Sequence, residues 1–180
     1  IFAETIHAVK ERLPHCTIEV LTPDFESNNQ ALDSVLNALP HVFNHNVETV
    51  RRFQPIIRPQ ASYSRSLHTL HTAAQWNPHV DVKSGIMVGL GETDDEVFET
   101  IDDLAEAGCR MLTIGQYLRP SRKHHPIDRY VEPEQFDRYK THALGAGFFG
   151  VASGPMVRSS YRAEDLYAQT VEARTAAVNP

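Results

Sequence analysis

Few features of this sequence direct it toward a particular partner. Its only two cysteines, Cys16 and Cys109, are too far apart to form a metal-binding knuckle, and we expect both to be small buried residues of a reducing compartment. The formal net charge of −6 leaves no basic footprint, so we expect no nucleic-acid partner. No run of about 18 apolar residues occurs, so we expect no membrane span.

What the chain does contain is typical of a soluble globular domain. Hydrophobic residues make up 41% and charged residues 22% of its 180 residues, enough chain for one domain with its own core. Because Ile1 is not a start methionine, we expect the sequence to begin inside a longer protein and to lack any targeting segment.

Hydrophobic spacing alternates between helical and extended segments. Phe2, Ile6 and Val9 share one face of a helix, whereas residues 82–88 are typical of a strand buried on both faces. The clearest helix begins at Thr93, which forms a capping box with Glu96. The pattern predicts helices near residues 2–13, 32–39, 64–74, 93–108 and 133–145, strands at 16–21, 41–45, 82–88, 110–118 and 148–153, and a short extended piece at 56–59.

This alternation predicts a parallel sheet covered by helices. Polar residues gather where the strands end, which is where both (βα) barrels and open parallel sheets bind ligands. The absence of a dinucleotide-binding fingerprint disfavours the open sheet, and the strands are too few for a closed barrel. We therefore predict an α/β fold, a partial (βα) TIM-type barrel in residues 1–154, followed by a tail in residues 155–180.

Four polar side chains crowd into residues 44–48, just after a predicted strand. Alternate residues of an extended segment share a face, so Asn44, Asn46 and Glu48 are expected to point together. Asparagine and glutamate can jointly hold a diol such as a ribose. The alternative is an Asx turn that caps a helix.

A glycine-rich segment, residues 83–93, joins the longest predicted strand to the capped helix. Glycines at positions 85, 89 and 91 let a ligand approach the backbone closely, and the helix start offers free amides. No Gly-Lys-Ser/Thr follows, so the segment is not a P-loop. A tight turn before a capped helix is the alternative.

Two further groups of side chains can bind anions. Arg58 or Arg65 can hold a carboxylate through a two-pronged contact, although Arg65 opens a predicted helix and can equally be solvated. Near the end of the chain, residues 158–161 read Arg-Ser-Ser-Tyr. Two hydroxyls, a guanidinium and a phenol can bind a phosphate or carboxylate, or present an alkoxide to a metal.

Several of these strings resemble lipoyl synthases, which are radical S-adenosylmethionine (SAM) enzymes, and occur in that family's order. They are Phe-Asn-His-Asn-Val-Glu-Thr at 43–49, Arg-Pro-Gln-Ala-Ser-Tyr at 58–63, the glycine-rich segment at 83–93, Gly-Gln-Tyr-Leu-Arg-Pro-Ser at 115–121 and Arg-Ser-Ser-Tyr-Arg-Ala at 158–163. The resemblance implies the C-terminal half of a radical SAM partial barrel. Residues 26–29 depart from the family's glycine-containing pattern.

The resemblance also implies roles for individual residues. The residues expected to contact SAM are Asn46, Glu48, Arg65, Ser84 and Val88, the last through its backbone. Gln116 and Tyr117 would contact the substrate from a strand end. Ser160 would be an iron ligand, and Arg158 would stabilise the negative charge beside it.

By the same resemblance, the intact enzyme inserts two sulfur atoms into an octanoyl chain carried on a lysine of a carrier protein. One 4Fe-4S cluster reduces SAM to a 5′-deoxyadenosyl radical that abstracts hydrogens, and a second, auxiliary cluster gives up sulfide. Both cysteine trios lie upstream in the family and neither is present here, so we expect this fragment alone to be inactive. Octanoylated E2 lipoyl domains and the glycine cleavage H protein are the implied partners, in the bacterial cytoplasm or the mitochondrial matrix.

Two alternatives stay open. A radical SAM sulfurtransferase of the biotin synthase type lacks the terminal Arg-Ser-Ser-Tyr string, so Ser160 discriminates against it. A non-catalytic fragment that only binds the carrier protein would need no iron. In either case a truncated barrel exposes an unpaired strand edge, which predicts poor solubility in isolation.

Overall fold

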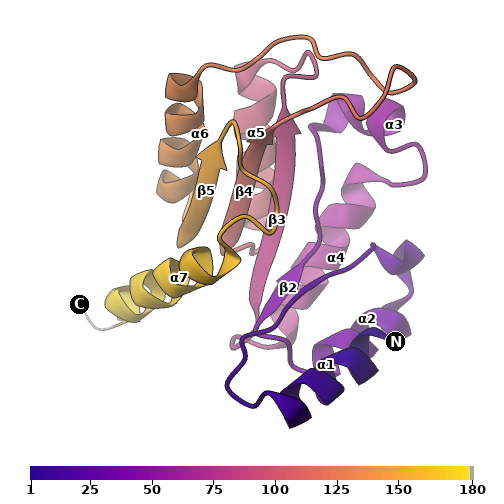
Figure 1. Ribbon diagram of the computed structural model, residues 1–180, viewed down its shortest axis with the longest axis vertical. Coiled ribbons are helices and arrows are strands. Elements are labelled where there is room, and N and C mark those ends of the chain that lie inside the picture. The colour runs from indigo at the N-terminus through magenta and orange to yellow at the C-terminus, as the bar shows by residue number, and fades with distance from the viewer. Residues whose placement is uncertain (179–180) are drawn as a thin grey trace.

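A computed structural model describes residues 1–178. Helices and strands alternate along most of the chain, as the hydrophobic spacing predicts (Figure 1). The helices are α1 (Phe2–Arg12), α2 (Asn29–Asn37), α3 (Gln54–Ile57), α4 (Tyr63–Trp76), α5 (Asp94–Glu106), α6 (Pro133–Gly145) and α7 (Ala163–Val178). The strands are β1 (Glu19–Leu21), β2 (Val42–Asn44), β3 (Asp81–Val88), β4 (Met111–Gln116) and β5 (Gly150–Gly154). No helix of the described residues is long and apolar enough to cross a membrane.

The five strands form one sheet in sequence order, β1-β2-β3-β4-β5, and every neighbouring pair is parallel. Each strand is reached by a crossover that carries a helix, as parallel pairing requires. The predicted α/β fold with a partial barrel is therefore confirmed.

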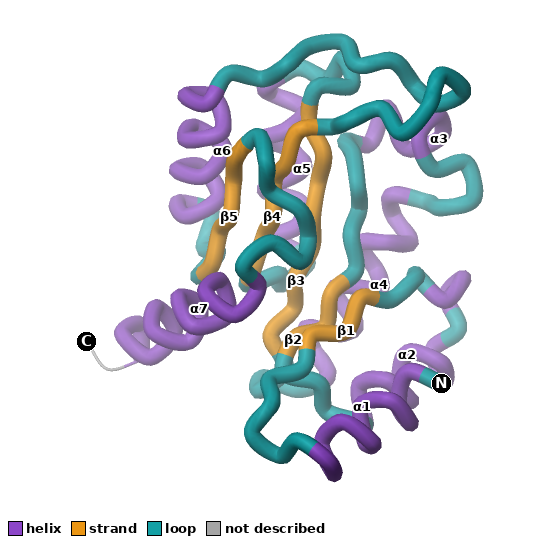
Figure 2. The backbone as a smooth tube through the Cα atoms, viewed as in Figure 1, coloured by secondary structure: helices purple, strands orange, loops and turns teal. Residues whose placement is uncertain are grey.

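The two faces of the sheet differ in chemistry because side chains alternate along each strand. Phe43, Val82 and Leu112 belong to the main apolar core, under the layer of helices that contains α2, α4, α5 and α6. Their strand neighbours Val42 and Met111 form a second, smaller cluster with Leu166 of α7. Figure 2 shows α7 and the loop before it on the opposite side of the sheet from α4, α5 and α6. We call the side that carries α7 the concave face.

The α5 helix begins with the predicted capping box. The Thr93 hydroxyl accepts the Glu96 amide, and the Glu96 carboxylate accepts the Thr93 amide at 2.8 Å. After the helix, Gly108 has φ +89°, and a Cβ there would lie 2.7 Å from the Cβ of Ala74. Only glycine meets both conditions without displacing a neighbour.

One local expectation is wrong, and one helix was not predicted. The piece at 56–59 is not extended, because α3 carries Pro55 in its first turn, where the fixed φ of proline favours a helix. The tail contains a helix, α7, that hydrophobic spacing does not reveal. Its fully buried residues are Leu166 and Thr170, one turn apart, so its apolar stripe is too narrow to stand out in the sequence.

The capping box at the start of α5 is expected to stabilise the folded protein. Thr93→Ala in the whole natural protein should lower the free energy of unfolding by about 1 kcal/mol, because an amide at the helix start loses its acceptor. Urea unfolding measures this change. Thr141→Ala is the matched control, because the Thr141 hydroxyl is exposed and only bonds back to the Asp137 carbonyl within α6. Equal losses in the two variants would contradict the capping role.

Candidate functional site

The concave face carries a polar network across its first three strands. The Lys83 ammonium on β3 bonds both carboxylate oxygens of Glu19 on β1, at 2.8 and 2.9 Å. The Asn44 amide on β2, which lies between them, donates to Glu19 Oε1 at 2.8 Å. Lys83 has no exposed surface, and a buried ammonium is tolerated only when its donors are satisfied. This part of the barrel interior is therefore built for polar contacts.

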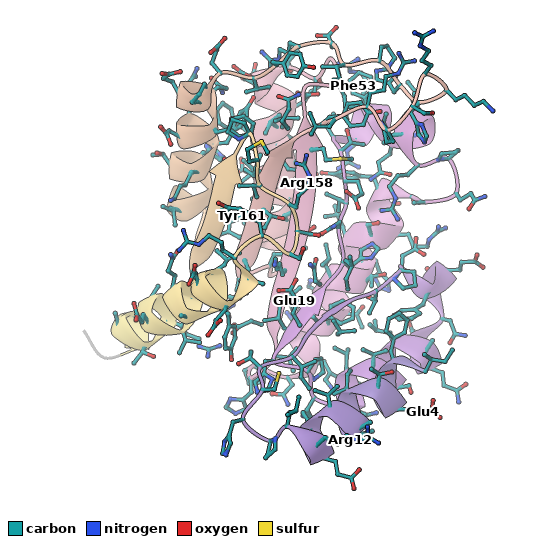
Figure 3. The ribbon with its side chains drawn as sticks, in the orientation of Figure 1. Glu4, Arg12, Glu19, Phe53, Arg158 and Tyr161 are labelled. Atoms are coloured by element: carbon teal, nitrogen blue, oxygen red, sulfur yellow. The ribbon has the colours of Figure 1, made fainter. Side chains whose placement is uncertain are left out.

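A pocket of about 210 Å³ opens on the same face toward the carboxyl ends of the strands. Asn46 and Glu48, which follow β2, supply its polar side chains from one side. Gly85 and Gly115 of the sheet line it, and the segment after β5 closes it with Val157, Arg158 and Ser159. Figure 3 shows Arg158 in front of the sheet, on the same side as Glu19.

Glycine is required at Gly85 because the pocket side chains approach its backbone. A Cβ at Gly85 would lie 2.8 Å from Asn46 Oδ1 and 2.6 Å from Thr113 Oγ1. Both distances are shorter than any ordinary carbon–oxygen contact, so any other residue would push these polar atoms out of place. At Gly85 it is therefore side chains of the protein, not a ligand, that approach the backbone closely, and the glycine lets Asn46 lie against the sheet.

Glu48 is held in a strained conformation at this pocket. Its φ is +71°, a left-handed value that costs a residue other than glycine about 1 to 3 kcal/mol. Two backbone hydrogen bonds to β3 enforce it, from the Glu48 amide to the Gly85 carbonyl and from the Met87 amide to the Glu48 carbonyl. The strain aims the carboxylate toward Asn46, whose amide nitrogen donates to Glu48 Oε1 at 3.3 Å.

The pocket leaves acceptors free for a ligand. Asn46 Oδ1 is buried and has no hydrogen-bond partner among the described residues. Burial raises the pKa of Glu48, although the Asn46 amide and the nearby Arg58 guanidinium oppose that rise. An unpartnered amide oxygen beside a carboxylate is the arrangement that two neighbouring hydroxyls of a ribose would satisfy.

The central residue of the Asn-His-Asn string points the other way. His45 is buried on the helix side, and its ring bonds the Thr22 carbonyl and the Ser66 hydroxyl, each at 2.9 Å. Burial lowers the pKa of His45, so the ring is neutral at neutral pH. Alternation along the strand thus explains why Asn46 reaches the pocket and His45 does not.

The other residues expected at the SAM site lie outside this pocket lining. Arg65 pairs with Asp24 at 2.5 Å, and together with the Glu26 amide it holds the pKa of Asp24 below its usual value although burial opposes this. The Ser84 hydroxyl accepts the Val47 amide at 3.3 Å on the helix side. Val88 is fully buried in the main core, and its carbonyl accepts the Tyr117 amide.

The side chains of Gln116 and Tyr117 both form hydrogen bonds to the long loop that follows β4, residues 118–131. The Gln116 side chain donates to the Arg129 carbonyl at 3.1 Å and accepts the Val131 amide at 2.9 Å. The Tyr117 hydroxyl donates to the His125 carbonyl at 2.9 Å. The structure therefore gives them a visible role in fixing the loop across the strand ends.

The Arg-Ser-Ser-Tyr string lies in the turn between β5 and α7. Arg158 lines the pocket and donates to the Val157 carbonyl at 2.7 Å. Ser160 is exposed and lies outside the pocket lining. The pocket thus brings together Asn46, Glu48 and Arg158, but not Ser160.

A hollow of about 650 Å³ lies beside the strand ends, between residues 23–31 and 58–61. It is larger than the pocket, and Asp24, Glu26 and Arg58 contribute its charges. Arg58 joins the two cavities, because its guanidinium donates to the Asn46 carbonyl at 2.9 Å. The smaller pocket is the better candidate for a binding site because it contains both an unpartnered buried acceptor, Asn46 Oδ1, and a residue with a strained backbone, Glu48.

Hydrophobic spacing and motif strings missed Lys83 and Glu19. A lysine or glutamate in a predicted strand is normally expected to face solvent. A buried pair can be predicted only when the two strands are known to lie close together. Lys83 could have been noticed because it is the single charged residue in the stretch 82–88, which is otherwise typical of a buried strand.

The described residues do not form a site for an iron–sulfur cluster. No group of three His, Cys, Asp or Glu side chains among them is placed to hold a metal ion. The expectation that both cysteines are buried is wrong for Cys16, which is exposed, and is confirmed for Cys109, whose burial raises the pKa of its thiol. A cluster needs several thiolates, so the donors visible here are insufficient. The pocket at Asn46 and Glu48, by contrast, fits the ribose of a nucleoside.

The barrel, the pocket and the motif order agree with the family to which the sequence can be assigned. Residues 2–115 match the model of the radical SAM superfamily, and the chain belongs to that superfamily. Within it, the chain is similar to lipoyl synthases over almost all of its length.

The relatives are bacterial. The chain is 51% identical to the lipoyl synthase of Rubrobacter xylanophilus over 178 aligned residues. The alignment covers 99% of this chain and 54% of that protein. It is 52% identical over 163 residues to the lipoyl synthase of Chlorobium phaeobacteroides, covering 91% of the chain and 56% of that protein. The chain therefore spans about half the length of these relatives.

One solved structure gives a weaker likeness. It is a radical S-adenosylmethionine methyltransferase, TsrM, from Kitasatospora setae, with a TM-score of 0.46 and 10% identity over 62% of this chain and 23% of that chain. This likeness is too low to support any argument about the pocket.

The raised pKa of Glu48 predicts a pH dependence of the protein's stability. Because ionisation is harder in the folded state, the stability of the ligand-free protein should fall as pH rises above about 4.3, the ordinary glutamate value. Glu48→Gln should therefore raise the free energy of unfolding at pH 7 and have little effect at pH 4. Urea unfolding at both pH values measures this difference. Glu99→Gln, at an exposed position on α5, is the control; the same pH dependence there would contradict the assignment.

Proposed function

We propose that the chain is part of a lipoyl synthase, an enzyme that inserts two sulfur atoms into an octanoyl chain attached to a carrier-protein lysine. The observation that carries this proposal is about 50% identity to lipoyl synthases along nearly the whole chain. The pocket at Asn46 and Glu48 supports it, because it lies where a radical SAM enzyme needs a nucleoside site.

The residues of the pocket have distinct tasks in this proposal. Asn46 Oδ1 and the Glu48 carboxylate would accept hydrogen bonds from the two ribose hydroxyls of SAM, and Gly85 leaves room for the Asn46 amide beside the sheet. When bound, SAM and a reduced 4Fe-4S cluster would supply the radical chemistry that removes hydrogen from the octanoyl chain. Arg58 lies close enough to contribute its charge to an anionic group, and Arg65 does so only if its pair with Asp24 opens.

Ser160 and Arg158 serve the second part of the reaction in this proposal. Ser160 would hold an iron of the auxiliary cluster, and Arg158 would stabilise the negative charge beside it. An alkoxide is a harder ligand than a thiolate and would leave that iron more labile. Ser160 is exposed, which leaves its hydroxyl accessible. The cysteine ligands of both clusters would come from parts of the relatives that this chain does not cover, so the chain alone is inactive.

The substrate is presented by a carrier protein. Octanoylated E2 lipoyl domains and the glycine cleavage H protein are the proposed partners, and the bacterial cytoplasm is the proposed compartment. Gln116 and Tyr117 support the substrate end indirectly, because they fix the loop from Leu118 to Val131 over the strand ends.

The proposal is tested with the whole natural protein, reconstituted anaerobically with iron and sulfide. Supplied with SAM and an octanoylated lipoyl domain, it should yield a product in which two sulfurs replace two hydrogens, detected by mass spectrometry. Turnover of desthiobiotin instead would favour the biotin synthase type. Tight binding of the octanoylated domain with no product would favour a non-catalytic carrier-binding role.

The ribose contact makes the third prediction. Asn46→Ala should raise the KM for SAM about tenfold or more, the usual effect of losing a hydrogen bond to a buried polar partner. Asn37→Ala, at an exposed position at the end of α2, is the matched control. An unchanged KM for SAM in the Asn46 variant would contradict the proposal that SAM binds in this pocket.

The fourth prediction concerns Ser160. Ser160→Ala in the reconstituted whole protein should bind fewer iron atoms per chain than the wild type, whereas its neighbour variant Ser159→Ala should bind the same number. Iron analysis measures this directly. Ser160→Cys should retain iron but turn over slowly, and normal turnover in that variant would contradict the role of a labile ligand.

A further inference from the structure

The segment between β5 and α7 carries one wall of the pocket but crosses the concave face as irregular chain. Val157, Arg158 and Ser159 all line the pocket from this segment. Within the segment, the Tyr161 amide bonds the Arg158 carbonyl at 2.8 Å and the Val157 amide bonds the Gly154 carbonyl at 3.1 Å. These bonds are local turns, and they attach the segment only to Gly154 at the end of β5, not to the strands that it crosses.

The strongest polar contact between the segment and the sheet comes from the buried lysine of β3. Lys83 Nζ donates to the Ser159 carbonyl at 2.6 Å, across 76 residues of sequence. Its two other hydrogen bonds go to Glu19, which is itself fixed by Asn44. The ammonium therefore has three acceptors, two from β1 and one from the C-terminal segment, and none of its charge faces water.

The neighbouring strand is shaped to receive the same segment. A Cβ at Gly115 of β4 would collide with the Val157 carbonyl, so the backbone of the segment lies directly on the sheet there. Arg158 adds a longer contact to the Gln116 carbonyl at 3.4 Å. Gly115 permits close approach, and of the two charge-assisted bonds between the segment and the sheet the one from Lys83, at 2.6 Å, is much the shorter.

We propose that Lys83, backed by Glu19, is a positioning residue that latches residues 157–159 onto the concave face and so completes the wall of the ligand pocket. Charge-assisted bonds in a buried setting are strong, and the Ser159 carbonyl is adjacent to Ser160 in the chain. The latch thus sets the position of Arg158 at the pocket and of the Ser160 backbone beside it. The identification of the ligand as SAM rests on the proposed function; the latch itself does not.

The latch is tested by hydrogen–deuterium exchange of the whole natural protein carrying Lys83→Met together with Glu19→Gln. Methionine preserves the apolar stem, and glutamine still accepts from Asn44, so no unpaired buried charge remains. We expect the amides of residues 157–161 to exchange about tenfold faster or more, as expected for the loss of a hydrogen bond to a charged group. The amides of α6 should not change.

The matched control removes an ion pair elsewhere. Arg52→Met with Glu96→Gln breaks an exposed pair of 2.6 Å that does not touch the concave face, and it should leave exchange at 157–161 unaltered. If the double variant at the latch does not fold, Lys83→Met alone, which leaves the partly exposed Glu19 carboxylate bonded to the Asn44 amide, should still raise exchange in the same amides. Unchanged exchange there would overturn the latch.

Kinetics distinguish positioning from general stability. A misplaced pocket wall should raise the KM for SAM with a smaller effect on kcat, whereas a smaller folded fraction would lower kcat alone. Faster exchange with an unchanged KM would overturn the role of the latch in shaping the pocket. A wild-type protein that makes no lipoyl product would reject the proposed function, and the exchange experiment would still decide whether the latch exists.

Discussion

The parallel pairing of β3 with β2 and β4 is the constraint on which the rest of the structure depends. β3 is the longest strand, and its register places Lys83 beside Asn44 and Gly85 beside Thr113. The same pairing holds Glu48 in its strained conformation, through two backbone bonds that continue the β2–β3 ladder beyond the end of β2. The pocket, the polar network and the contact surface of the C-terminal segment all include residues of this strand.

The concave face is polar where an ordinary core would be apolar. A buried lysine, two asparagines with unpartnered oxygens and a run of glycines reduce the apolar area that this face can bury. The helix side offsets this with an extensive apolar cluster, and α7 adds a small one near the start of the strands. Breaking a buried pair such as Lys83–Glu19 by removing one partner typically costs about 3 to 5 kcal/mol, so the network also constrains which substitutions the barrel tolerates.

Much of the fold is predictable from the sequence because its signals are local. Alternating apolar periods give the strands and most helices, and the Thr93 capping box gives the start of α5 to the residue. Asn46 and Glu48 could be placed together because alternation in an extended segment is a local rule. Lys83 and Glu19 could not be paired, because 64 residues separate them and only the strand order brings them together. The α7 helix was hidden by its narrow apolar stripe. The departure of residues 26–29 from a glycine-containing pattern is visible as left-handed backbone at Phe25, Glu26 and Ser27, where glycine would relieve strain.

The most direct test of the account is a crystal structure of the whole natural protein, prepared anaerobically with SAM. We expect the ribose of SAM to lie against Asn46 Oδ1 and the Glu48 carboxylate, with residues 157–159 forming the opposite wall of the pocket, held by Lys83. SAM in the larger hollow between Asp24 and Arg58, with the pocket at Glu48 empty, would contradict the account.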